Sequence, residues 1–221
     1  MTTAGGPTLP GTGPWDPNCE WPPHPRRLLD PDTVFDSMVP MYLARLNKTQ
    51  MLRTAFANRA HIPGRVRGEL LGLGRSYSGV TELVIPTPFA EIHPFTREQA
   101  AEARKRQVAW RGMSVIDDDP SLDRGEAEVL TLAAGHTGWV VVSQDSNALS
   151  NAKIKKIPPF AAPDVLLVFA VQGLCLAANA WKIYQAMLDL DDGMRPSRFW
   201  PNNAESEAKF MAFAAELGCK V

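Results

Sequence analysis

Four acidic residues in this chain could meet at one site and hold a divalent metal ion. Two of them closely follow runs that are typical of central strands, a short extended run at 33–35 and an apolar run at 139–142. Open α/β sheets bind ligands beyond the carboxyl ends of such strands, so we expect these two side chains to lie together. The third lies at the start of the helix before the second strand, and the fourth lies on the inward side of an early helix. The two acids after the strands are Asp36 and Asp145, the acid at the helix start is Glu126, and the acid on the early helix is Glu69.

The chemistry of these four side chains favours magnesium or manganese. Unpaired carboxylates held close together repel one another, which raises the pKa of some of them unless a hard cation compensates the charge. Oxygen ligands suit Mg²⁺ or Mn²⁺, and the scattered cysteines offer no zinc set. Such a site suits phosphodiester hydrolysis, because the metal activates water and stabilises charge on the attacked phosphorus. We predict that Asp36, Glu126 and Asp145 hold the metal, while Glu69 completes the acidic set or orients a water.

Each acid also has a simpler interpretation, because acidic residues at helix starts are common as caps and as partners of the helix dipole. Glu126 could favour its helix N-terminus, and Asp145 could cap the helix that follows the strand. Glu69 could be solvated on a helix face. The acidic run at 117–119 could be a solvated loop or an extension of the acidic site. Spacing alone leaves these alternatives open.

Polar and basic residues near the acids are candidates for substrate binding. Cationic side chains near a cleft are sufficient to contact the phosphates of a nucleic acid. Ordinary surface charge explains the same residues equally well, and Asn147 could be a supplementary metal ligand or a helix cap. The substrate-binding candidates are Ser37, Arg65, Arg67, Ser143, Asn147 and Lys153.

Strands that alternate with helices predict an α/β fold with a sheet of three to five mostly parallel strands. Beyond the two central strands, 61–63 is strand-like and 81–85 is prone to form a strand. Asn47 is predicted to cap a helix over 48–57, with Gln50 completing a capping box, and Thr96 with Gln99 forms a second such box. The other helices are expected at 38–46, 64–73, 97–110, from 125 to about 133, and at 147–153, 164–172, 177–190 and 204–217.

The length of 221 residues indicates one domain with an appendage. Residues 1–31 are rich in Pro and Gly and are expected to be a disordered tail, in which Trp15 and Trp21 could dock on the body or on a partner. A domain is expected over 32–202, with a C-terminal helix at 203–221 packed on it. The 23 basic and 24 acidic residues create no large basic field. Without a signal peptide or an apolar run long enough to cross a membrane, we expect a cytoplasmic protein.

Several segments, in the right order, resemble PIN domains such as those of VapC-type toxins. The GEAE motif at 125–128, followed by WVVVSQD at 139–145, is similar to the second half of those domains. VFDS at 34–37 is similar to their opening strand, and IPGRVRGEL at 62–70 fits their Pro-x-x-Val-x-x-Glu-Leu helix. GLCLAANA at 173–180 resembles a later segment of the shorter members.

This resemblance implies a three-layer α/β/α sandwich with a mostly parallel central sheet, and a Mg²⁺- or Mn²⁺-dependent endoribonuclease. Members of this kind are often the toxin of a toxin–antitoxin pair, with an antitoxin protein as partner, and are often homodimers. Several relatives carry two adjacent aspartates after the last strand, where this chain has Gln144 first, which reduces the charge offered to the metal.

Two other functions fit the same resemblance. The first is a structure-specific DNA nuclease that uses the same acids. The second is a catalytically weakened PIN-like scaffold that acts through protein or nucleic-acid binding, with its tryptophan-bearing tail recruiting a partner; Gln144 favours this alternative.

Overall fold

A five-stranded sheet lies at the centre of the chain, with the strand order β3-β2-β1-β4-β5 and every neighbouring pair parallel. The computed structural model describes residues 15–18, 20–77, 79–85, 87–89, 91–190 and 192–220. β1 and β4 are neighbours, with Phe35 paired to Val142 at their carboxyl ends. The strands are β1 (Thr33–Phe35), β2 (Ala60–Pro63), β3 (Glu91–His93), β4 (Val140–Val142) and β5 (Pro159–Phe160).

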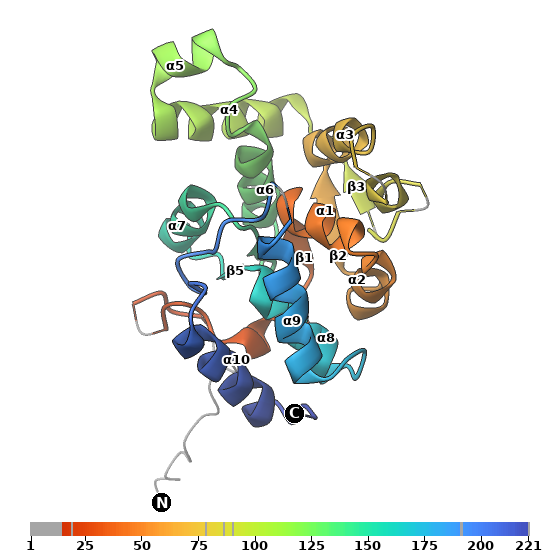
Figure 1. Cartoon of the computed structure of the whole chain (residues 1–221). Helices are drawn as coiled ribbons and strands as arrows, with labels where there is room; N and C mark the ends of the chain where they lie inside the picture. Colours follow the sequence, from red (N-terminus) through yellow and green to blue (C-terminus); the bar gives the residue numbers. More distant parts are fainter. Residues whose placement is uncertain are drawn as a thin grey trace, which may run out of the picture.

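Helices flank this sheet and make the fold a three-layer α/β/α sandwich, which confirms the predicted fold class (Figure 1). α6 lies against β1, β2 and β4 with α3 beside it, while α8 packs with α2, α9 and α10. α4 and α5 project from this body (Figure 1). The helices are α1 (Met38–Arg45), α2 (Thr49–Ala55), α3 (Gly64–Leu73), α4 (Arg97–Arg111), α5 (Met113–Asp118), α6 (Arg124–Ala134), α7 (Ser146–Ile154), α8 (Ala162–Val171), α9 (Ala177–Leu188) and α10 (Ala204–Glu216), with short 3-10 helices η1 (Pro25–Leu28) and η2 (Val80–Leu83).

Apolar runs without alternation form the buried centre of the sandwich. All three residues of β4 are buried, as are Val34 and Phe35 of β1. Strands that are covered on both faces need apolar side chains at every position, which explains this pattern. α8 is likewise buried from Ala162 to Ala170, and Asp164 is the one charged residue in that range. Among the described residues, no helix combines the length and apolar character needed to cross a bilayer.

The two predicted capping boxes have different outcomes. The box of Thr96 and Gln99 forms as predicted at the start of α4. Asn47 does not cap a helix: its φ of 56° is left-handed, and the amide of Lys48 donates to the carbonyl of Leu43 at 2.7 Å. Asn47 therefore terminates α1, because asparagine tolerates the left-handed conformation that closes a helix. α2 begins only at Thr49.

The prediction of a strand at 81–85 was wrong. This segment forms η2, in which Val80 and Leu83 are both fully buried. Side chains three residues apart lie on the same side of a 3-10 helix, so this conformation buries both. The edge strand next to β2 is instead β3, a short segment between turns that the apolar pattern did not reveal.

The N-terminal segment differs from the expected disordered tail over its described part. Residues 1–14 and 19 lie outside the described residues. Leu28 is fully buried in the core, and Nη1 of Arg59 donates to the carbonyls of Leu28 and Pro31. The ring of Trp21 packs edge-on against Phe199. Leu28 and Trp21 thus supply apolar contacts to the folded body, which the prediction of a disordered tail from Pro and Gly content did not include.

Candidate acidic active site

The pairing of β1 with β4 brings Asp36 and Asp145 to the same edge of the sheet. The amide of Asp36 donates to the carbonyl of Val142 at 2.9 Å, which continues the register beyond Phe35. Oγ of Ser143 donates to Oδ2 of Asp36 at 3.1 Å, and it accepts a hydrogen bond from the amide of Asp145, also at 3.1 Å. Ser143 therefore links the two acidic positions directly.

Ser37 links Asp36 to Glu69 in a similar way. The amide of Ser37 donates to Oδ1 of Asp36 at 2.7 Å, and its hydroxyl donates to the same oxygen at 3.4 Å. The side chain of Ser37 also lowers the pKa of Glu69, against the rise that burial causes. Ser37 is the N-cap residue of α1, two residues after the end of β1, so the strand-to-helix turn places it beside Asp36. Ser37 and Ser143 were predicted to bind substrate, and in the structure both position carboxylates.

Glu69 lies against the first turn of α6, the helix that carries Glu126. A Cβ atom added at Gly125 would lie 2.9 and 3.0 Å from the two carboxylate oxygens of Glu69. Those distances are shorter than van der Waals contact, so only glycine leaves room for the carboxylate there. The close approach places Glu69 of α3 next to the residue that precedes Glu126.

The charges of the four acids affect the pKa values within the cluster. Burial, together with the negative charges of Asp36 and Glu69, raises the pKa of Glu126 to about 8. Burial and the charge of Glu69, with a smaller part from Asp145, raise the pKa of Asp36 to about 6, although hydrogen bonds from Ser37 and Ser143 act in the opposite direction. Burial also raises the pKa of Glu69. The four acids predicted from the sequence therefore converge.

The character of this cluster fits a hard divalent cation. Its donors are carboxylate oxygens, and a bound cation would relieve the repulsion that raises their pKa values. In the described part of the chain, no three Asp, Glu, His or Cys side chains form a ready-made set of metal ligands. The fit therefore rests on the donor chemistry and the mutual repulsion of the acids, and binding would require their side chains to turn toward a shared ion.

Asp145 also caps α7, which was the simpler interpretation of this residue. Its Oδ1 accepts hydrogen bonds from the amides of Asn147 at 2.7 Å and Ala148 at 2.8 Å. Both bonds use the same oxygen, and Oδ2 has no hydrogen-bond donor among the described residues. Capping and metal binding are thus compatible at Asp145. Asn147 is exposed and takes part through its backbone amide.

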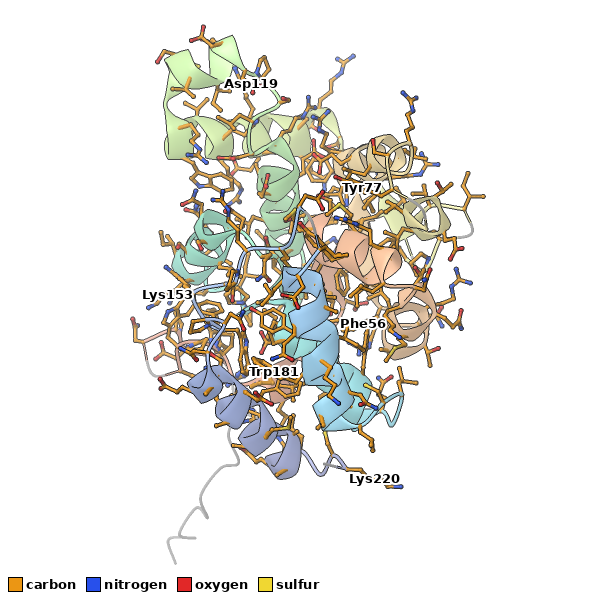
Figure 2. The ribbon with its side chains drawn as sticks, viewed as in Figure 1. Phe56, Tyr77, Asp119, Lys153, Trp181 and Lys220 are labelled. Atoms are coloured by element: carbon orange, nitrogen blue, oxygen red, sulfur yellow. The ribbon has the colours of Figure 1, made fainter. Side chains whose placement is uncertain are left out.

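The basic candidates are placed differently from one another. Nε of Arg65 donates to Oε1 of Glu69 at 3.2 Å, which puts Arg65 at the rim of the acids. Arg67 follows two residues later on α3, so its side chain leaves the helix about 200° away from that of Arg65. Lys153, labelled in Figure 2, lies eight residues beyond Asp145, about 12 Å along α7. Its ammonium is 4.5 Å from the ring centre of Trp21. Only Arg65 among them is drawn into the acid cluster.

Asp119, the last residue of the acidic run 117–119, lies on the part of the molecule that projects with α4 and α5 (Figure 2). Nη2 of Arg104 donates to Oδ1 of Asp117 at 2.9 Å, and the hydroxyl of Ser121 donates to Oδ1 of Asp119 at 2.6 Å. Both acids belong to exposed ion-pair or turn contacts, in keeping with the solvated interpretation of this run.

Two buried polar residues near the site have structural contacts that the sequence did not reveal. Gln144 donates through Nε2 to the carbonyl of Arg195 at 2.9 Å, and its Oε1 accepts from the amide of Ala162 at 3.2 Å. It therefore ties the end of β4 to the start of α8. Glu128 accepts hydrogen bonds from the amide of Arg65 and from Nε of Arg124. The spacing of Arg124 and Glu128, four residues apart on a helix, was the one available signal for this contact.

A cavity of about 1060 Å³ has none of the four acids in its lining. Trp139, which precedes β4, lines it together with Lys155 and Lys156, which follow α7. It thus lies at the amino ends of the strands, opposite the acidic edge. None of the acids lines this open cavity, so cavity volume does not locate the acid site.

A family model described as a PIN domain matches residues 32–203, a span that covers more than half of the chain and includes all four acids. PIN domains are generally nucleases, and they typically use divalent metals. No curated protein matches the chain.

Proposed function

The chain belongs to the PIN-domain family, and from this premise we propose that it is a metal-dependent endoribonuclease that hydrolyses phosphodiester bonds in RNA. The observation that carries the proposal is the convergence of Asp36, Glu69, Glu126 and Asp145 at the carboxyl edge of β1 and β4. The motif resemblance to VapC-type toxins supports the choice of RNA. The proposal extends to a role as the toxin of a toxin–antitoxin pair and to a homodimer.

Asp36, Glu126 and Asp145 would hold Mg²⁺ or Mn²⁺. When bound, such an ion supplies an activated water and stabilises the charge that develops on the phosphate. Ser37 and Ser143 each bind one oxygen of Asp36 and so fix the orientation of that carboxylate. Glu69 is held between Ser37 and Arg65, where it can orient a water molecule. No nucleophilic side chain is needed.

The structural role of Gln144 supports an active enzyme over a weakened scaffold. Its amide donates to the carbonyl of Arg195 and accepts from the amide of Ala162. An amide in this position serves packing between β4 and α8, so the absence of a second aspartate there does not remove an oxygen directed at Asp36. The scaffold alternative loses its main support from the sequence.

The test of this proposal compares three end-labelled substrates: single-stranded RNA, single-stranded DNA of the same sequence, and a DNA flap. With Mn²⁺ the full chain is expected to cut the RNA internally and to leave it intact when EDTA replaces the metal. Cleavage of the flap with sparing of RNA would favour the DNA nuclease. Absence of cleavage together with absence of Mn²⁺ binding in calorimetry would leave the scaffold.

Substitution of Gly125 by alanine is expected to separate activity from stability. The added methyl group would displace the Glu69 carboxylate, and a misplacement of about 1 Å at a reacting site can cost about a hundredfold in rate. The atoms displaced belong to the flexible end of a side chain, and alanine is favoured over glycine in helices by up to about 1 kcal/mol. We therefore expect a 10- to 100-fold loss of RNA cleavage with an unchanged or higher melting temperature.

The matched control is Gly72→Ala in α3, where an added Cβ meets nothing within 4 Å. This variant should keep full cleavage activity. If Gly125→Ala and Gly72→Ala cleave RNA at equal rates, the contact between Glu69 and α6 has no part in the reaction.

A further inference from the structure

Arg111 lies next to the acid site, a position that no sequence pattern predicted. It is the last residue of α4, which packs against α6 and lies across its amino-terminal end (Figure 1). One turn earlier, Nε2 of the buried Gln107 donates to the carbonyls of Pro120 at 3.3 Å and Leu122 at 2.7 Å. These bonds join the end of α4 to the turn that leads into α6. They therefore fix the position of the backbone from which the Arg111 side chain extends.

The guanidinium of Arg111 is held by two hydrogen bonds to one carboxylate. Nε donates to Oδ2 of Asp123 at 2.5 Å, and Nη2 donates to Oδ1 at 3.2 Å. Asp123 occupies the N-cap position of α6 with a left-handed φ of 52°, but its side chain does not cap the helix. An aspartate at this position normally accepts from its own first turn. Here that interaction is replaced by the pair with Arg111.

The pair with Asp123 brings the charge of Arg111 close to the acids. Asp123 and Glu126 are three residues apart, so they lie on the same side of the first turn of α6. The hydrogen bond to Asp123 raises the pKa of Arg111, and the charges of Asp145 and Glu126 contribute in the same direction. The side chain is 38% exposed and therefore open to a ligand.

We propose that Arg111 binds a phosphate group of the RNA strand next to the bond that is cut, an inference that rests on the nuclease function proposed above. A guanidinium has five N–H donors, of which the pair with Asp123 uses two. Among the described residues, Nη1 has no hydrogen-bond acceptor. Arg111 can therefore bind a phosphate while it stays attached to Asp123.

The charge balance at the site explains why such a residue is needed. The acids repel an approaching phosphate, and the chain as a whole has a formal net charge of −1, so no general basic field attracts RNA. Arg65 is already bonded to Glu69 within the acid cluster. Arg111 adds a cation at the rim, on the side formed by α4 and α6.

The experiment measures binding and cleavage of a short, fluorescein-labelled single-stranded RNA by the full chain and three variants. Binding is followed by anisotropy over a series of KCl concentrations in EDTA, in an Asp145→Asn background that prevents cleavage. Arg111→Ala is expected to weaken binding about tenfold and to reduce the slope of log Kd against log salt by about 0.7, as expected for one lost phosphate contact on a single strand. Without the Asp145→Asn substitution and with Mn²⁺ present, Arg111→Ala should lower kcat/KM for RNA cleavage by 10- to 100-fold.

The two other variants separate a specific contact from loss of charge or fold. Arg111→Lys keeps the charge but loses the planar fork, so it should retain the salt slope and recover only part of the affinity. Lys105→Ala removes a cation that is 79% exposed on another side of α4, and it should leave the RNA affinity, salt slope and kcat/KM unchanged. Thermal melting shows whether each variant is folded. If Arg111→Ala is not folded, Arg111→Lys is compared with the unchanged chain instead.

Different failures have different meanings. If the unchanged chain cleaves RNA while Arg111→Ala matches Lys105→Ala in affinity and salt slope, the role of Arg111 is overturned and the nuclease function stands. If the unchanged chain neither binds nor cleaves RNA, both proposals fail.

Discussion

Replacement of Asp36 by asparagine is expected to lower RNA cleavage by on the order of 10³-fold while the fold is preserved. Asp36 is 1% exposed, and both of its oxygens accept hydrogen bonds, from Ser37 and Ser143. Asparagine keeps the shape of the side chain but removes the charge that the metal requires. Steady-state cleavage of labelled RNA with Mn²⁺ measures the loss of activity, and calorimetry with Mn²⁺ measures the accompanying loss of affinity.

The matched control is Asp164→Asn, because Asp164 is also buried and its pKa is also raised to about 6 by burial. Its Oδ2 accepts hydrogen bonds from the amide of Ala161 and from Nε1 of Trp200, and it lies at the start of α8. An amide oxygen can accept the same two bonds, so this variant should retain the cleavage rate and Mn²⁺ affinity. Equal cleavage by Asp36→Asn and Asp164→Asn would remove Asp36 from the mechanism.

The acid site was predictable to the extent that it depends on strand ends. β4 was recognisable because its residues are apolar at every position, and β1 because a short extended run precedes Asp36. Parallel neighbours bring the residues that follow them to one edge of the sheet. Asp36 and Asp145 follow from that argument. The roles of Ser37 and Ser143 in holding the carboxylates did not follow, because a short polar side chain next to an acid can equally point toward substrate.

Other parts of the site depend on how separate layers pack. The contact of Glu69 with Gly125 joins α3 to α6, and no local pattern encodes the distance between two helices. The place of Arg111 depends on the hydrogen bonds of Gln107 to a turn 13 and 15 residues further along the chain. The predicted cap at Asn47 was wrong for a different reason. Asparagine is suited to either end of a helix, so its position alone does not say which end it occupies.

Mn²⁺ binding is expected to weaken about a hundredfold between pH 8 and pH 6. A carboxylate must lose its proton to bind a metal, and the pKa of Glu126 is raised to about 8. Each pH unit below that value therefore costs about tenfold in affinity, and the raised pKa of Asp36 adds to the loss near pH 6. Calorimetric titration with Mn²⁺ at a series of pH values measures this trend. Glu126→Gln should bind more weakly at pH 8 and lose most of the pH dependence, whereas an equal affinity of the unchanged chain at pH 6 and pH 8 would contradict the assignment of Glu126.

The stability of the metal-free protein is expected to change with pH in the opposite direction. Because the pKa of Glu126 is raised from 4.5 in the unfolded chain to about 8, the folded state holds a proton over this range that the unfolded state has lost. The free energy of unfolding therefore rises as the pH falls through 8 toward 4.5. Saturating Mn²⁺ should stabilise the chain most at pH 8, where the repulsion it relieves is greatest. Thermal melting with and without Mn²⁺ thus distinguishes a scaffold from a nuclease. A scaffold that binds no metal would show only the rise in stability as the pH falls. A metal-dependent nuclease would also show stabilisation by Mn²⁺ that is greatest at pH 8.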